Sequence, residues 1–392
     1  MTNSLLKKFI RNNAIVFILL NSAGLLSYIF QVVLGRTLPP DQYGSFNSLL
    51  ATGALITTPI TILHLVFSRF IARINVQKLQ HIKSLLTLSL KFILCIALGI
   101  ILIGFSFSPW LKNFLNTETT LPIILMLLAA CFSSFQQIFI AVCEGMQRFL
   151  SLGMISGGGA LAKILFAVLF VVIFGWGVEG GLLALSFATF SALAYGIWQL
   201  QDVFKVQAVD LHSSSLMEMA RFSIPSFFMI TMVSIMCNID IVLARHYCPP
   251  DQAGYYATAT ILGRIAFFLP SSLLMVLFPS VAKATVSGSK DNHYLWVSLG
   301  LTFILSGGVF LVFFIAGQSI VQLFYGEQYY SAVPILEIVS AAMGLLAMSH
   351  VIFSYNMARS EFGFLWPLFG GVILLLSLVF LYHDSAQTIA WV

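Results

Sequence analysis

The chain has 392 residues, of which 59% are hydrophobic and only 8% are charged, and its mean hydropathy is +0.98. Soluble domains carry about 25% charged residues, and no globular core of this length could bury so much apolar surface. The composition therefore excludes an ordinary soluble protein and indicates a chain that lies largely in lipid. The net charge of +5 would suggest nucleic acid only if the basic residues gathered on one surface.

Apolar segments follow one another along the whole chain, separated by polar turns. A helix needs about 20 apolar residues to cross the hydrocarbon core. The first segment follows Lys7, Lys8 and Arg11 but is too long for a signal peptide and lacks a small-residue cleavage site, so we expect a transmembrane helix. The sequence predicts eleven spans, at residues 13–34, 43–66, 85–107, 121–142, 152–174, 180–200, 222–243, 254–280, 295–317, 333–355 and 362–382.

The basic residues lie mainly on one side of this predicted membrane. With a cytoplasmic N-terminus, thirteen of the nineteen Lys and Arg fall in inner segments, and only Arg36, Lys112 and Arg245 fall in outer ones. Cytoplasmic loops of membrane proteins carry such an excess. We therefore expect a multi-pass protein with its N-terminus in the cytoplasm. Because the basic residues are spread over several loops, no nucleic-acid partner is expected.

One loop occurs twice. The segment Val32 to Ile56, VVLGRTLPPDQYGSFNSLLATGALI, matches Ile241 to Ile265, IVLARHYCPPDQAGYYATATILGRI. Six residues recur after 210 positions: Pro39, Pro40, Asp41, Gln42, Gly44 and Gly53 return as Pro249, Pro250, Asp251, Gln252, Gly254 and Gly263. Arg36 returns as Arg245 with a one-residue shift. A Pro-Pro-Asp turn suits any helical hairpin, but the shared register over some 25 residues, including Gly53 and Gly263, indicates an internal duplication.

Six predicted spans separate the two copies, so both loops return to the same, outer side. The expected fold is therefore all-α: two parallel six-helix bundles related by a pseudo-two-fold axis along the membrane normal. We expect an N-terminal lobe at residues 1–200, a cytoplasmic linker at 201–219 and a C-terminal lobe at 220–392. The final HDSAQTIAWV (His383 to Val392) should be an outer loop and the stub of an incomplete twelfth helix.

These repeats, with SRFIAR (Ser68 to Arg73) and EGMQRF (Glu144 to Phe149), resemble the polysaccharide-biosynthesis flippases. That family shares a superfamily with the MATE drug exporters and the lipid II flippases. The resemblance covers essentially the whole chain in topology, although the family commonly has twelve or fourteen spans. It implies alternating-access transport of undecaprenyl-diphosphate-linked oligosaccharide (O-antigen, capsule or exopolysaccharide units) across a bacterial plasma membrane. A glycan polymerase and a chain-length protein would be further partners.

Cations within predicted spans need a reason, because each costs about 2.5–3.5 kcal/mol to insert. Lys163 and Arg264 lie near the predicted midplane and in opposite halves of the chain. Facing each other across a cavity, they could bind a diphosphate, Arg as a bidentate fork and Lys as a point charge. Alternatively each pairs within its own lobe, Arg264 with Asp240. Lys91 is a further candidate cavity residue, but it lies near the inner boundary and can snorkel.

Asp240 lies near the outer end of its predicted span, in the motif NID. Such a carboxylate could bind H⁺ or Na⁺ in a cation-coupled transporter, or be the structural partner of Arg264 or Arg245. The five cysteines form no CxxC pair and no cluster with histidine, so neither a metal nor another cofactor is expected.

Other classes of protein fit less well. A membrane glycosyltransferase needs acids or bases gathered at an accessible site, whereas the outer loops carry only scattered single acids, so no enzyme is expected. A channel would need a ring of charges or a filter. The closer alternative is a MATE-type cation-coupled drug exporter, whose cationic substrates call for acidic residues within the spans. The predicted N-terminal spans contain no acidic residue, and their charged residues are Lys91 and Lys163. A degenerate copy without transport activity is the remaining alternative.

Overall fold

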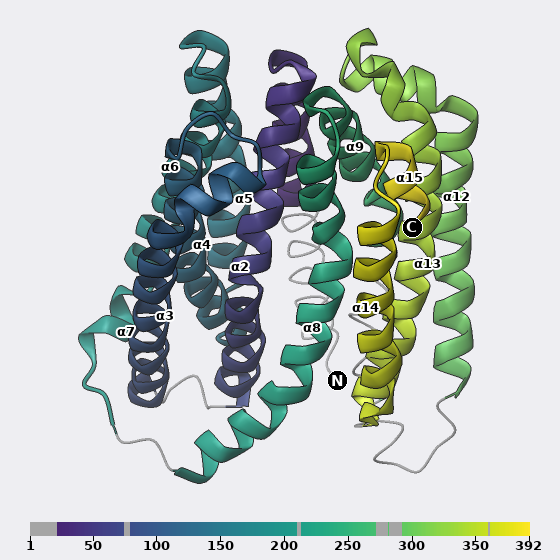
Figure 1. Ribbon diagram of the computed structural model, residues 1–392. Helices are drawn as coiled ribbons and strands as arrows, with labels where there is room; N and C mark the ends of the chain where they lie inside the picture. Colours follow the sequence, from purple (N-terminus) through teal and green to yellow (C-terminus); the bar gives the residue numbers. More distant parts are fainter. Residues whose placement is uncertain (1–21, 74–78, 210–212, 272–280, 282–291, 360) are drawn as a thin grey trace, which may run out of the picture. The chain divides into compact units, whose positions relative to one another are not determined.

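The protein is described by a computed structural model that covers residues 22–73, 79–209, 213–271, 281, 292–359 and 361–392 (Figure 1). Every regular element in these ranges is a helix, which confirms the predicted all-α fold. Nine helices among the described residues are long and apolar enough to cross a membrane. They correspond to nine of the eleven predicted spans. Residues 22–37 are helical and include the described part of the predicted first span (13–34), whose beginning lies outside the described residues.

The chain divides into two compact units, one formed by Met1–Leu38 with Gly53–Phe227 and the other by Pro39–Thr52 with Phe228–Val392. Helix α2 (Pro40–Arg73) and helix α8 (Ser213–Tyr247) each contribute to both units. The predicted pair of parallel six-helix bundles, and their boundary at residues 201–219, stay predictions.

The first unit is built around helix α6 (Gly177–Gln199), which packs against α4 (Leu121–Gly145) and α5 (Phe149–Ala167). Helix α3 (Leu79–Phe114) packs against α4, and a π-helical stretch, η1 (Val168–Ile173), continues α5. Small residues allow these close approaches. A methyl group on Gly145 of α4 would lie 2.7 Å from Cβ of Ile71, so α2 and α4 touch there through backbone and β-carbon.

The second unit is built around helix α13 (Val333–Ala358), which packs against α9 (Pro250–Gly263), α10 (Ile265–Phe268) and α12 (Asn292–Phe324). A 3₁₀ turn, η2 (Glu327–Ala332), leads into α13, and η3 (Phe362–Phe364) leads into α14 (Leu365–Leu381). The last helix, α15 (Ala386–Trp391), contacts α9 and α13. Its first turn is capped by the Ser385 hydroxyl, which accepts a hydrogen bond from the Thr388 amide at 3.1 Å, so the expected helix after His383 does form.

The segment after α6 is docked on the first unit. It forms a short helix, α7 (Gln201–Lys205), whose Val203 is fully buried. Four residues after the end of α7, the Val209 amide donates to the Ser84 hydroxyl at 2.8 Å, and this hydroxyl donates to the Val209 carbonyl at 2.5 Å. The Lys83 ammonium lies 4.3 Å from the centroid of the Phe204 ring. The first part of the predicted linker is therefore fixed to the start of α3.

The span predicted at residues 254–280 is not one uninterrupted helix, and its end lies outside the described residues. Helix α9 ends at Gly263, and the Arg264 amide closes the last turn by donating to the carbonyl oxygens of Thr260 and Leu262. A methyl group on Gly263 would lie 2.9 Å from a methyl carbon of Val339 on α13. This glycine thus allows close packing at the cost of helix propensity.

The two copies of the duplicated loop pack against each other within the second unit. A methyl group on Gly254 would lie 2.0 Å from the carbonyl oxygen of Pro40, and one on Gly44 would lie 2.7 Å from the Gly254 amide nitrogen. Only glycine permits backbones to approach so closely. The duplicated Pro-Pro-Asp-Gln-x-Gly turn is therefore a self-complementary contact as well as a helix start.

Aromatic side chains surround this contact. Tyr43, next to Gly44, is fully buried and packs edge-on against Tyr325 and Tyr329, with ring centroids 5.7 and 5.9 Å away. The hydroxyl groups of Tyr43 and Tyr325 lie 3.3 Å apart. Such edge-to-face pairs add stability beyond their buried area, so the beginning of α2 is anchored firmly in the second unit.

Candidate functional site

A buried polar region of the second unit lies between α8 and α9. Tyr256, Thr260 and Arg264 are spaced four residues apart, which places them on one face of α9 and its final turn. The Tyr256 hydroxyl donates to Oδ2 of Asp240 on α8 at 3.1 Å, and both side chains are buried. The Arg264 guanidinium donates through Nη2 to the carbonyl oxygen of Cys237, one turn before Asp240. We call these five residues the α8–α9 polar cluster.

Three atoms of this cluster are buried without a hydrogen-bond partner among the described residues: Oδ1 of Asp240, Oγ1 of Thr260 and Nε of Arg264. Within that part of the chain, no ion pair joins Asp240 to Arg264. Buried polar groups are normally satisfied, and an orphaned charged group is especially costly. The cluster therefore retains donor and acceptor capacity that its own side chains do not use.

The predicted partners of Asp240 are found only in part. The sequence suggested Arg264 or Arg245, but the carboxylate of Asp240 accepts its hydrogen bond from Tyr256. Arg245 is buried as well, and its Nη1 donates to the backbone carbonyl of Asp41 at 3.4 Å. Arg264 uses a backbone carbonyl instead of a carboxylate. Arg264 lies close enough to Asp240 for the two charges to attract each other, as predicted, but the two side chains form no ion pair.

The other two predicted cavity cations belong to the first unit. Lys163 is half-buried on α5, one turn after Gly159, which packs against Ala192 of α6. Within the described residues, no hydrogen bond or ion pair of Lys163 occurs, so its charge is uncompensated there. Lys91 is exposed on α3. The pairing of Lys163 with Arg264 across one cavity stays a prediction.

Tyr256 and Thr260 were missed by the sequence reasoning. Their signal was present, because a Tyr, a Thr and an Arg at intervals of four in an apolar helix form a polar stripe. Hydropathy alone does not distinguish such a stripe from scattered polar residues, and Tyr was counted with the apolar residues.

A second charged group lies at the junctions of α2, α4 and α6 in the first unit, around the EGMQRF motif. Nε2 of His64 lies 2.8 Å from Oε2 of Glu144. The Arg148 guanidinium forms a two-pronged ion pair with Asp202, with one contact of 3.0 Å, and also donates to the Gln199 carbonyl at 3.2 Å. Hydrogen bonding from Arg148 lowers the pKa of the Asp202 carboxyl below its usual range. These pairs tie the helix ends together and are best explained as structural.

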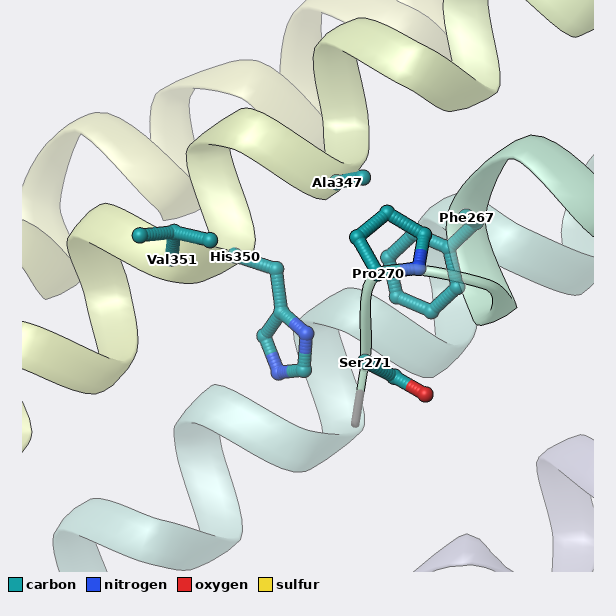
Figure 2. A pocket seen from close by; sticks show the side chains of 6 residues that line it. All are labelled: Phe267, Pro270, Ser271, Ala347, His350 and Val351. Carbon is teal, nitrogen blue, oxygen red and sulfur yellow. The ribbon is translucent and has the colours of Figure 1, made fainter. Parts of the chain in front are cut away.

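A small pocket lies beside α10 (Figure 2). This hollow is bordered by Phe267, Pro270, Ser271, Ala347, His350 and Val351. Figure 2 shows His350 reaching from α13 toward the segment that carries Phe267, and the two rings stack with centroids 5.4 Å apart. The lining is mostly apolar, so this pocket is a packing defect beside the end of α9 and not a candidate cargo site.

Within the described residues, no group of three or more His, Cys, Asp or Glu side chains could hold a metal ion. All five cysteines are free thiols.

Comparisons with known proteins agree with this architecture. Residues 10–285 match the sequence profile of the family described as polysaccharide biosynthesis protein. An inward-facing MATE-family multidrug resistance transporter of the MOP superfamily is similar in structure, with a TM-score of 0.79 at 13% identity over 93% of this chain and 90% of that one. The lipid II flippase MurJ, in an inward closed conformation, gives 0.73 at 11% identity over 97% and 84%.

A MOP superfamily transporter from Pyrococcus furiosus, described as having a binding pocket of reversed polarity, gives a TM-score of 0.67 at 13% identity over 97% and 90%. At these identities the structural likeness establishes the fold alone. No curated protein sequence matches the chain. The family profile and the fold confirm the resemblance that the sequence motifs indicated.

Proposed function

Since the chain belongs to the polysaccharide biosynthesis protein family, we propose that it is a membrane flippase for an undecaprenyl-diphosphate-linked oligosaccharide. In this proposal the protein lies in a bacterial plasma membrane with its N-terminus in the cytoplasm. It carries O-antigen, capsule or exopolysaccharide units to the outer leaflet by alternating access, and it delivers them to a glycan polymerase and a chain-length protein.

The observation that carries this proposal is the pair of cations in apolar helices. Arg264 keeps a buried Nε without a partner, and Lys163 has no acid beside it in the described part of the chain. A cation in a low-dielectric region is costly unless an anion lies close to it, and a dianionic diphosphate would offset that cost for Lys163 and use the open donor of Arg264 while it is bound. Cationic drugs would do the opposite, which favours a lipid-linked diphosphate over the cargo of a MATE-type exporter.

Asp240 would supply the coupling to an ion gradient. Tyr256 fixes one carboxylate oxygen, and the other is buried and free to bind a proton or Na⁺. An ionisable group inside a membrane helix commonly serves such a purpose. We therefore assign cargo binding to Lys163 and Arg264, with Lys91 as an accessory cation, and ion coupling to Asp240.

Substitution of the two cations tests the cargo. In cells that depend on this chain for glycan export, Lys163→Gln and Arg264→Gln are each expected to lower export at least about tenfold, because a hydrogen bond to a charged group contributes about 1.5–3 kcal/mol. Lys163→Glu should be worse, because it repels a diphosphate. Asp240→Asn should make export insensitive to the ion gradient.

Lys205→Gln is the matched control, because this lysine is exposed at the end of α7, outside the membrane spans. Membrane insertion is measured for every variant by the amount of full-length protein in the membrane fraction. Normal export by both neutral variants would show that the cations are structural. Loss of drug resistance without any change in glycan export would favour the MATE-type alternative.

A further inference from the structure

Helix α2 belongs to both units at once. Its first turns, Pro39–Thr52, belong to the second unit, where Tyr43 and Gly44 make the contacts described above. From Gly53 onward it belongs to the first unit, where His64 contacts Glu144 and Ile71 meets Gly145 of α4. A single continuous helix thus links two separately packed bodies, and the change of unit occurs between Thr52 and Gly53.

The duplicated segment shows an interruption at the same register. Gly53 corresponds to Gly263 in the second copy, and α9 ends at Gly263, with a turn at Arg264 before α10 begins. In the first copy, α2 continues through Gly53 without interruption. One register position is therefore a local irregularity of the helix in one repeat and the boundary between units in the other.

The backbone hydrogen bonding of α2 is weakened just after this boundary. Pro59 has no amide proton, so the carbonyl of Leu55 loses its usual partner. The Thr57 hydroxyl donates to the Gly53 carbonyl at 2.9 Å, and the Thr58 hydroxyl donates to the Ala54 carbonyl at 2.8 Å. Such hydroxyl bonds compete with the helix ladder and favour bending. Prolines are also the commonest cause of sharp helix kinks.

Helix α8, which also crosses between the units, repeats this combination. It changes unit between Phe227 and Phe228, and it carries Pro225 two residues earlier. Helix α3 also contains a proline, Pro109, but lies entirely in the first unit. The association of an internal proline with a unit boundary therefore occurs twice, and α3 offers a natural comparison without the boundary.

We propose that Gly53–Pro59 is a hinge in α2, which lets the turns anchored by Tyr43 and Gly44 move with the second unit while the rest of the helix stays with the first. The hinge is the functional equivalent of the Gly263–Arg264 break. Hinges are a few residues that absorb the dihedral change of a domain movement. The inference concerns motion within one helix and does not depend on the cargo.

The spacing between two spin labels on α2 tests the hinge directly. Bioorthogonal labels replace Gln42 and Leu65 in the full chain in lipid nanodiscs, so the native cysteines remain. A straight helix places these positions about 35 Å apart, from 23 residues at 1.5 Å each. Wild-type protein is expected to give a broad distribution that extends below this value. Pro59→Ala restores the missing backbone donor and should narrow it to one peak near the straight-helix distance.

Pro109→Ala is the matched control and should leave the distribution as broad as in the wild type. Should Pro59→Ala fail to fold, the combined Thr57→Val and Thr58→Val variant removes the competing hydroxyls and should narrow the distribution as well. A wild-type distribution that is already a single narrow peak near 35 Å would overturn the hinge. So would a distribution that stays unchanged in the variant. Neither outcome bears on glycan export, so failure of the hinge and failure of the flippase proposal are distinguishable.

Discussion

At the scale of single residues, Gly254 is the glycine, among those that the structure describes, with the least space for a side chain. The carbonyl group that a side chain would meet belongs to the backbone of Pro40, which cannot rotate away as a side chain could. Clashes of this kind must be relieved by separating the two helix starts, and that separation would also disturb the packing of Tyr43 on Tyr325.

Gly254→Ala is therefore expected to destabilise the protein by at least about 1–3 kcal/mol, the usual cost of overpacking. The measurement is the apparent unfolding temperature of the purified protein in detergent. Gly308→Ala is the control, because Gly308 is exposed on α12 and a methyl group there meets nothing within 4 Å. That change should be neutral or slightly stabilising, since alanine is the better helix former. Equal unfolding temperatures for the two variants would contradict the backbone contact.

Residues of the candidate site could be predicted only in part from the sequence. Arg264, Lys163 and Asp240 stand out because a charge in an apolar run is conspicuous in any sequence. The hydrogen bond from Tyr256 to Asp240 and the use of a backbone carbonyl by Arg264 depend on how α8 and α9 are rotated about their axes. A hydropathy pattern does not contain that rotation.

At the scale of elements, α7 shows how a short polar segment is fixed to a membrane helix. The Ser84 hydroxyl donates a hydrogen bond to the backbone carbonyl of Val209 and accepts one from the backbone amide of the same residue. The buried Val203 and the contact of Lys83 with Phe204 add apolar and cation–π attraction on the same side.

Ser84→Ala should loosen the segment that follows α7. Two hydrogen bonds at about 1 kcal/mol each are lost, which corresponds to roughly thirtyfold faster amide exchange at residues 201–209, measured by hydrogen–deuterium exchange. Ser106→Ala, whose hydroxyl bonds only to the Leu102 carbonyl of its own helix, should leave this exchange unchanged. Unchanged exchange in the Ser84 variant would show that Val203 and Phe204 hold the segment by themselves.

Nine predicted spans were confirmed because long apolar runs bounded by polar turns are the strongest signal in a membrane sequence. The break at Gly263 was not predicted, because a window of about 20 residues averages over a one-residue interruption. The close contact of this glycine is also non-local: it lies against Val339, 76 positions further along the chain. The docking of residues 201–209 escaped prediction for the same reason, since Ser84 is 125 positions away.

At the scale of the whole molecule, the charge distribution and the repeated loop together predict the membrane topology. An even number of spans between two copies of one loop predicts that both copies lie on the same side, and from the excess of Lys and Arg we predict that this side is the exterior.

Single cysteines at Asp41 and Asp251 should therefore both react with a membrane-impermeant maleimide added to intact cells. A cysteine at Lys205 should react only after the membrane is permeabilised, and the wild-type chain measures the background from native thiols. Labelling of one loop without the other would be incompatible with parallel repeats, and labelling of Lys205 from outside would invert the predicted orientation.

The contact between Gly44 and Gly254 also limits how far the two copies of a duplicated sequence can diverge. After a duplication, each copy is free to diverge wherever the two meet different surroundings. Here each copy of the turn packs directly against the other, so a substitution in either copy affects the packing of both. Divergence at this point would require two compatible substitutions at once. Under the predicted duplication, this mutual packing accounts for the close resemblance of the two loops, while the helices that follow them have diverged in sequence.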